Sequence, residues 1–166
     1  LDPQPDDAIL EIGCGNGRWI SWIASRVSIA YASDLSWQAL AKSPKEISGA
    51  NRFCADAAYL PVADARLSKI LAVDVIEHIP DDQGALYQMA RALQPGGRIV
   101  ITTLVANRPS YTFRLVFDDH VREYDADSLV SLVQQSGLEV RDVFGFYYAP
   151  RMIAREIQAV AEKIPL

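Results

Sequence analysis

The amino-acid sequence predicts an α/β fold: a doubly wound, mostly parallel sheet with helices on both faces. Three observations favour this class. Short apolar runs alternate along the chain with stretches of helical periodicity. The first apolar run ends in a glycine-rich turn at residues 13–17, and a helical stretch follows at once. The second apolar run ends in the carboxylate Asp34, about 20 residues beyond the first glycine, which is the separation found in nucleotide-binding βαβ units.

Each element follows from its own pattern. Apolar runs bounded by turn residues predict strands at 8–12, 29–33, 52–55, 68–73 and 138–146, and the run 93–101 leads into a further strand. Apolar residues three and four positions apart predict helices at 18–27, 37–42, 83–93 and 125–136. The run 68–73 is almost entirely apolar, which is typical of a central parallel strand covered on both faces.

The composition is that of one globular domain spanning residues 1–166. Half of the residues are apolar, which is enough to bury a core of ordinary size. Position 1 is leucine rather than methionine. We therefore expect that the natural amino-terminal end is missing, and a shortened carboxyl end is a second expectation considered below.

Charge and cysteine usage narrow the function classes. Sixteen basic and twenty-one acidic side chains give a net charge of −5 without long runs of one sign, which argues against nucleic-acid binding and favours a small-molecule partner. The two cysteines have neither metal-ligand spacing nor the density of a disulfide scaffold. No apolar run reaches the roughly 18 residues that a membrane span needs, and no leader pattern is present. We expect a cytoplasmic protein without a membrane partner.

The glycine turn defines the candidate binding site. Glycine allows positive φ and close approach of a ligand to the backbone, and the following helix offers unpaired N–H groups. The spacing is Gly-x-Gly-x-Gly, one residue shorter than the dinucleotide fingerprint. In its context, LEIGCGNG at residues 10–17, the turn resembles the first motif of the class I S-adenosylmethionine-dependent methyltransferases, which have an acidic residue two positions before the first glycine.

Three later stretches resemble further motifs of that family, in the expected order: ADAAYLP at 55–61, DVIEHIPD at 74–81 and LQPGGRIVI at 93–101. The resemblance covers about residues 8–103. It implies that S-adenosylmethionine binds here and leaves as S-adenosylhomocysteine. It assigns the cofactor to residues at or beside the ends of the first four strands: Glu11, Gly13, Cys14, Gly15, Gly17, Asp34, Leu35, Asp56, Ala57, Asp74 and Val75.

Two of these acids also have a simpler explanation. Asp34 would accept hydrogen bonds from the ribose hydroxyls, yet an aspartate at this position could instead cap the helix expected at 37–42. Asp56 would face the adenine amino group, with the N–H of Ala57 at a ring nitrogen, yet it could be a turn-forming aspartate. The resemblance favours the cofactor roles.

His78 is the candidate catalytic residue, because a neutral imidazole accepts a proton near pH 7. The alternative is that His78 packs in its loop without titrating, since methyl transfer depends mainly on positioning and often needs no base. Some methyltransferases hold magnesium with a Glu-x-x-Glu-His stretch; here Asp74 replaces the first glutamate, ahead of Glu77 and His78. Many members carry a similar stretch without metal, so we expect no metal site.

Residues 105–124 have no clean period and are rich in aromatic and basic side chains. A connection of this length usually carries function, and the family places its acceptor pocket here. We expect Tyr111, Arg114 and His120 to contact the substrate; the alternative is a lid helix whose aromatic residues belong to the core. HVREY at 120–124 resembles a stretch common in this branch, and the pattern assigns it no chemical role.

The end of the chain has a helical spacing. One face of residues 152–164 would carry Ile153, Ile157, Val160 and Ile164, which predicts a final amphipathic helix. The family sheet has a seventh strand, inserted antiparallel between the fifth and sixth, and no candidate follows residue 164. We therefore expect that the seventh strand is lost by truncation, disordered or replaced by a rearrangement.

The expected function is transfer of a methyl group from S-adenosylmethionine to a small-molecule acceptor by in-line displacement. Two other functions stay open at this point. A nicotinamide-dependent oxidoreductase shares the glycine turn and the ribose acid, although the short glycine spacing opposes it. A catalytically silent cofactor-binding protein with a regulatory role would keep the same motifs. The pattern specifies neither the acceptor atom nor the oligomeric state.

Overall fold

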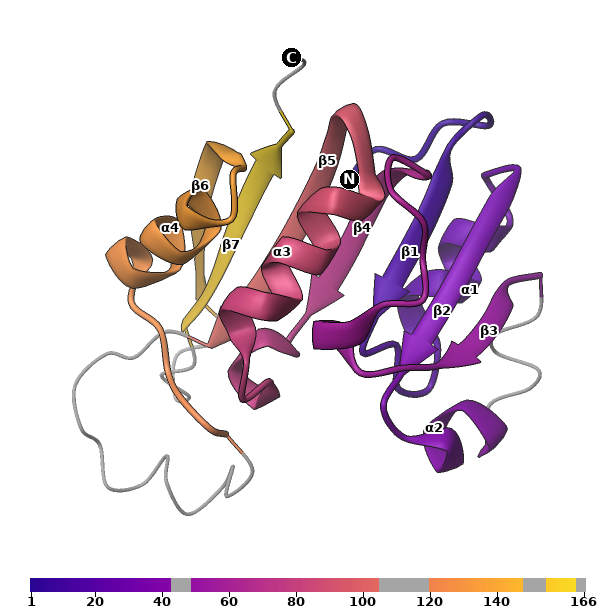
Figure 1. Ribbon diagram of the computed structural model, residues 1–166. Coiled ribbons are helices and arrows are strands. Elements are labelled where there is room, and N and C mark those ends of the chain that lie inside the picture. The colour runs from indigo at the N-terminus through magenta and orange to yellow at the C-terminus, as the bar shows by residue number, and fades with distance from the viewer. Residues whose placement is uncertain (43–48, 105–119, 148–154, 164–166) are drawn as a thin grey trace.

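The computed structural model describes residues 1–42, 49–104, 120–147 and 155–163. Over these residues the chain forms one seven-stranded sheet flanked by helices (Figure 1). The strands are β1 Ala8–Ile12, β2 Ile29–Asp34, β3 Asn51–Cys54, β4 Leu67–Val73, β5 Leu93–Leu104, β6 Glu139–Tyr147 and β7 Arg155–Glu162. The helices are α1 Arg18–Ala24, α2 Trp37–Lys42, α3 Asp82–Ala92 and α4 Ala126–Gln135, with short 3-10 helices η1 Ala57–Tyr59 and η2 Ile76–His78.

The strands follow the order β3-β2-β1-β4-β5-β7-β6 across the sheet. β1 pairs in parallel with β2 on one side and β4 on the other. β3 and β5 extend the parallel part in both directions. The strand order therefore reverses between β1 and β4, and sheets of this kind bind ligands beyond the carboxyl ends of the strands at that point. The predicted fold class is confirmed.

The carboxy-terminal strand corrects one prediction. Residues Arg155–Glu162 form β7 rather than the helix expected at 152–164, and β7 lies antiparallel between β5 and β6. The seventh strand, which we expected to be missing, is present. Its side chains follow a period of two: Ala159 and Ala161 are buried on one face of the sheet, and Val160 packs on the other. The same residues also have a helical spacing of apolar side chains. Pairing with β5 and β6 stabilises the extended form over the helix.

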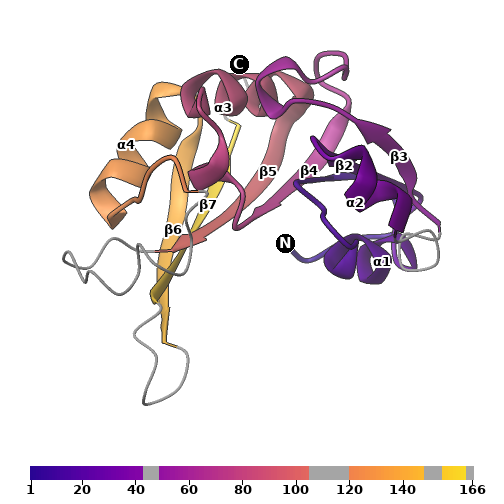
Figure 2. The same cartoon turned by 90° about the horizontal axis from the view of Figure 1, so that it is seen from below.

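Alternate strand residues pack into two cores, one on each face of the sheet. On one face Leu10 belongs to a cluster that includes Leu86 of α3 and Leu129 of α4. On the opposite face Ile9 packs in a cluster with Ile20 of α1. Figure 2 shows α3 and α4 on one side of the sheet and α1 and α2 on the other. Both faces of the central strands are thus covered, as predicted.

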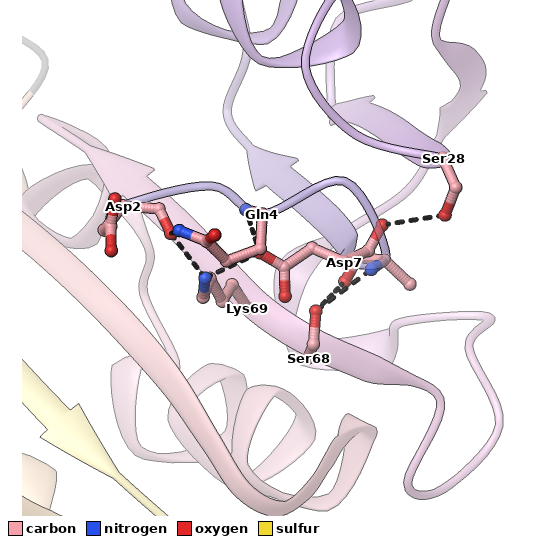
Figure 3. Close-up of polar contacts among 7 residues, drawn as sticks. Asp2, Gln4, Asp7, Ser28, Ser68 and Lys69 are labelled. Carbon is pink, nitrogen blue, oxygen red and sulfur yellow. Dashed lines mark hydrogen bonds and ion pairs between the residues drawn. The ribbon is translucent and has the colours of Figure 1, made fainter.

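Polar contacts hold the amino-terminal segment to the sheet at the edge opposite the glycine turn. Lys69 of β4 donates to the carboxylate of Asp7 at 2.6 Å, and the hydroxyl of Ser28 donates to the Asp7 carbonyl at 3.3 Å (Figure 3). Burial opposes ionisation of Asp7, but hydrogen bonds from Lys69, the backbone of Gln4 and Ser68 outweigh it and lower the pKa of that carboxyl. These contacts fix the start of β1 against its neighbours.

Candidate functional site

The residues assigned to a cofactor lie at the carboxyl ends of four neighbouring parallel strands. The glycine turn follows β1, Asp34 ends β2, and Asp56 and Asp74 follow β3 and β4. Ile12 at the end of β1 is level with residues near the ends of both neighbouring strands. These ends meet at the lower edge of the sheet in Figure 1. One edge therefore carries a backbone turn and three carboxylates from separate parts of the sequence.

The first glycine is required by both conformation and space. Gly13 has φ of +65°, a left-handed conformation that side chains disfavour. A Cβ atom at this position would lie 2.9 Å from Cβ of Val75 and still closer to its Cγ2. The turn after β1 therefore packs directly against the loop after β4. A side chain at position 13 would therefore push the two halves of the site apart.

Glu11 anchors the helix that follows the turn. Its carboxylate is only 2% exposed and accepts a hydrogen bond from the backbone N–H of Ile20 at 2.6 Å. Gly17 is the N-cap of α1 and has no side chain to satisfy such a group, so Glu11 supplies the missing acceptor from β1. Burial, reinforced by the charge of Asp34 and opposed by the Ile20 hydrogen bond, raises the pKa of Glu11 to about 8. Direct contact between Glu11 and a cofactor remains a prediction.

Cys14 is a packing residue inside the turn. Its side chain is buried, and its backbone N–H donates to the carbonyl of Ser33 at 3.0 Å. Burial and the nearby charges of Glu11 and Asp34 raise the pKa of the thiol to about 12. A raised pKa favours the protonated thiol, which is the form typical of a buried packing cysteine.

Asp34 joins the turn to the next helix. Oδ2 of its carboxylate accepts the N–H of Gly15 at 2.8 Å, and Oδ1 accepts the N–H of Ser36 at 2.8 Å. Ser36 rather than Asp34 caps α2, because the Ser36 hydroxyl accepts the N–H of Ala39 at 3.2 Å. Asp34 forms an Asx turn ahead of that helix with one oxygen, and its other oxygen braces the glycine turn. The neighbouring side chain of Leu35 is 72% exposed. A carboxylate and an apolar side chain are therefore presented side by side.

Asp56 begins the short helix η1. Its side chain accepts the N–H of Ala58 at 2.9 Å, so the turn-forming role is observed. Ala57 is buried next to it, whereas Tyr59, at the end of η1, is 77% exposed. The adenine-binding role of Asp56 and Ala57 remains a prediction.

Asp74 is held in an unusual backbone conformation by a partner that the sequence did not indicate. Its φ is +50°, which costs energy for a residue with a side chain. Thr102 of β5 offsets this cost: its hydroxyl donates to the Asp74 carboxylate at 3.0 Å, and its carbonyl accepts the Asp74 N–H at 3.0 Å. Only tertiary pairing of β4 with β5 brings these residues together, so no local pattern could have identified Thr102.

Glu77, His78 and His120 form a polar group beside this loop. Their metal-ligating atoms all lie within 4.8 Å of one another, and the two imidazole rings meet edge to face with centroids 4.6 Å apart. Among the described residues no hydrogen-bond partner is found for either oxygen of the buried Glu77 carboxylate. Burial is the main cause that raises the pKa of Glu77, and the charge of Asp74 adds to it, while the charge of His78 opposes the shift.

This group differs from the metal-ligand set weighed from sequence. That set combined Asp74 with Glu77 and His78, whereas the structure joins His120 to the last two. His120, which was expected at the substrate, lies beside the candidate catalytic residue His78, and its contact with a substrate remains a prediction. Tyr111 and Arg114, the other two substrate candidates, lie outside the described residues.

Comparisons with known proteins identify the family of the chain. The sequence profile of a family described as "Methyltransferase domain" matches residues 2–143. An O-methyltransferase of Penicillium expansum is 29% identical over 160 residues, covering 86% of this chain and 56% of that protein. A ubiquinone biosynthesis O-methyltransferase of Coxiella burnetii is 25% identical over 158 residues, covering 86% of this chain and 68% of that protein.

The same likeness extends to solved structures. An S-adenosylmethionine-dependent methyltransferase of Mesorhizobium loti superposes with a TM-score of 0.81 at 17% sequence identity, covering 98% of this chain and 94% of that chain. This similarity concerns the fold. The chain spans little more than half of the Penicillium relative. None of the helices in the described ranges combines the length and apolar character that a membrane crossing requires.

Proposed function

The chain belongs to the methyltransferase-domain family, and from that premise we propose that it transfers a methyl group from S-adenosylmethionine to a small-molecule acceptor. One observation carries the proposal: a glycine turn and three carboxylates meet at the carboxyl ends of β1 to β4. Such an edge suits a ligand with a charged amino-acid end, a ribose and an adenine. A nucleic acid or membrane partner is not part of the proposal, and we place the reaction in the cytoplasm on the sequence grounds given above.

The proposed cofactor contacts follow the strand order. The turn residues Gly13, Cys14, Gly15 and Gly17, with Glu11 beneath them, would receive the methionine part. Asp34 would bind the ribose hydroxyls, because a carboxylate already braced by two N–H groups keeps lone pairs for further donors. Leu35 would cover one face of the adenine, whose edge would meet Asp56 and Ala57. Asp74 and Val75 would border the methionine end.

Methyl transfer requires little covalent chemistry from the side chains. The cofactor supplies an activated methyl group, and the protein has to align donor and acceptor and exclude water. Relatives named O-methyltransferases support a hydroxyl acceptor. A hydroxyl loses its proton during methylation, and we assign the acceptance of that proton to His78, with His120 on the substrate side.

The polar group also supports a second candidate arrangement. Two imidazoles and a carboxylate are ligand groups that bind zinc, manganese and iron in proteins. The Glu77 oxygens are buried without a hydrogen-bond partner among the described residues. In that arrangement Glu77, His78 and His120 would hold a divalent cation beside the acceptor. Calorimetric titration with Zn²⁺, Mn²⁺ and Mg²⁺ in the presence of S-adenosylhomocysteine tests it, and absence of binding rejects it.

A thermal-shift comparison tests the main proposal. S-adenosylhomocysteine should raise the melting temperature, because a ligand at 100 times its Kd stabilises the native state by about 2.7 kcal/mol. NAD at the same concentration should not. A shift with NAD alone would favour an oxidoreductase. Tight binding of S-adenosylhomocysteine without radiolabelled methyl transfer to any fraction of a cell extract would favour a catalytically silent binding protein.

A further inference from the structure

The segment His120-Val121-Arg122-Glu123-Tyr124, which the sequence pattern left without a role, is fastened along the loop that joins β4 to α3. Its backbone makes the first attachment: the N–H groups of Val121 and Arg122 both donate to the carbonyl of Glu77, at 2.9 Å and 3.3 Å. Glu77 is the residue directly before His78. The segment therefore begins its contact with this loop at the candidate catalytic residue.

Arg122 makes the second attachment with its side chain. One terminal nitrogen donates to the carbonyl of Ile79 at 2.8 Å and pairs with the carboxylate of Asp82 at 2.7 Å; the other donates to the carbonyl of Pro80 at 2.7 Å. The same Asp82 oxygen accepts the hydroxyl of the buried Tyr124 at 2.6 Å. A planar guanidinium can serve three acceptors at once, which a lysine ammonium on a flexible stem cannot reproduce.

The attachments have one geometric result at the site. They hold His120 with its ring 4.6 Å from the ring of His78, although about 40 residues separate the two in sequence. Closing a chain segment of that length costs conformational entropy, and the contacts of Arg122 with the 79–82 region offset it. The arrangement of Glu77, His78 and His120 thus depends on the contacts of Arg122 with residues 79–82, which we call the clamp.

We propose that Arg122 is a positioning residue for the acceptor side of the site: by clamping residues 120–124 to the loop at 79–82, it sets His120 against His78 and Glu77. The inference rests on the proposed methyl transfer for its functional consequence. The guanidinium of Arg122 binds Ile79, Pro80 and Asp82, none of which is assigned to the cofactor or to the imidazole group. Loss of Arg122 should therefore impair methyl transfer to the acceptor while leaving cofactor binding nearly unchanged.

The test uses the full chain and two matched arginines. Arg91 also donates to two backbone carbonyls, those of Leu60 and Val62, and pairs with Asp64 at 2.8 Å. Arg122→Lys and Arg91→Lys therefore remove the same kind of clamp, one beside the imidazoles and one away from them. The chain has only two histidines, so the nuclear Overhauser effect between their ring protons is simple to assign and reports the contact directly.

We expect Arg122→Lys to lose at least half of this ring-to-ring signal, while the Kd for S-adenosylhomocysteine changes less than twofold. Methyl transfer from tritiated S-adenosylmethionine, onto the extract fraction that the unmodified chain methylates, should fall at least tenfold in kcat/KM. Arg91→Lys should keep the ring-to-ring signal. An intact signal in Arg122→Lys, or a lost signal with unchanged transfer, overturns the inference.

A second variant covers the case in which Arg122→Lys does not fold. Tyr124→Phe removes only the hydroxyl that Asp82 accepts and leaves the guanidinium in place, so the ring-to-ring signal should weaken rather than vanish. Failure of the proposed function would look different. In that case the unmodified chain would not bind S-adenosylhomocysteine, while the ring-to-ring signal would still respond to Arg122.

Discussion

Replacement of Glu11 by glutamine gives the sharpest test of the electrostatics beneath the glycine turn. The amide oxygen of glutamine can still accept the N–H of Ile20, which the carboxylate accepts at 2.6 Å, but the side chain can no longer ionise. Glu11→Gln therefore keeps the hydrogen bond that anchors α1. It removes only the burial of a titratable group.

The sign and size of the effect follow from the pKa. Folding raises the pKa of Glu11 from 4.5 to about 8, with burial as the main cause. Between these two pKa values the folded state keeps a proton on Glu11 that the unfolded state has lost. The free energy of unfolding therefore falls as pH rises through this range. Linkage puts the loss between pH 5 and pH 8 on the order of 3 kcal/mol. The Glu11→Gln variant should not lose this free energy, because glutamine does not titrate.

The assay is urea denaturation of both proteins at pH 5 and pH 8 without cofactor. The difference in the free energy of unfolding between Glu11→Gln and the unmodified chain should grow by about 3 kcal/mol from the lower to the higher pH. Glu139→Gln is the matched control, because it removes a carboxylate whose side chain is 43% exposed. A difference that stays constant across this range would refute the reasoning, since Glu11 would then be ionised in the folded state.

Three further predictions address the turn, the ribose acid and the opposite edge of the sheet. Gly13→Ala should cost about 1–3 kcal/mol of stability by overpacking against Val75, and it should weaken S-adenosylhomocysteine binding. Adding Val75→Ala to the same chain should restore part of the lost stability, measured by calorimetry. No restoration would contradict the contact between the two residues. Asp34→Ala should weaken cofactor binding by roughly 1.5–3 kcal/mol, and an unchanged Kd would remove Asp34 from the site. Lys69→Met leaves the Asp7 carboxylate without its cation and should lower the free energy of unfolding by about 1–3 kcal/mol, more at pH 7 than at pH 3 because the pKa of Asp7 is lowered in the folded state. The Kd for S-adenosylhomocysteine should not change in this variant, and a weakened Kd would show that the two edges are coupled.

Local patterns predicted the amino-terminal half of the fold well. The ranges expected for the first four strands agree with β1 to β4 to within one residue at each end, because each is a short, mostly apolar run followed by glycine or aspartate. The same logic placed Asp34, Asp56 and Asp74 at one edge, since parallel strands present their carboxyl ends together. What could be predicted was the position of these acids along the strands.

The bracing of Asp74 and the contact between the two histidines could not be predicted, because both depend on residues distant in sequence. Thr102 supports Asp74 only once β5 lies beside β4. His120 lies beside His78 in a segment whose backbone and side chains are hydrogen-bonded to a loop formed far earlier in the chain. The error at β7 has a related origin. Residues 155–162 satisfy both periods, and the neighbouring strands, which select the extended form, lie outside any local window.

The antiparallel placement of β7 has a consequence for biosynthesis. Within the described residues, β6 is hydrogen-bonded to the sheet through β7, because β7 lies between β5 and β6 in the strand order. A ribosome that has released residues up to 150 leaves both of those strands with open hydrogen-bonding edges, which invite pairing with other chains. The sheet formed by the described residues can close only when β7 emerges, so a nonsense mutation ahead of residue 155 should yield aggregates.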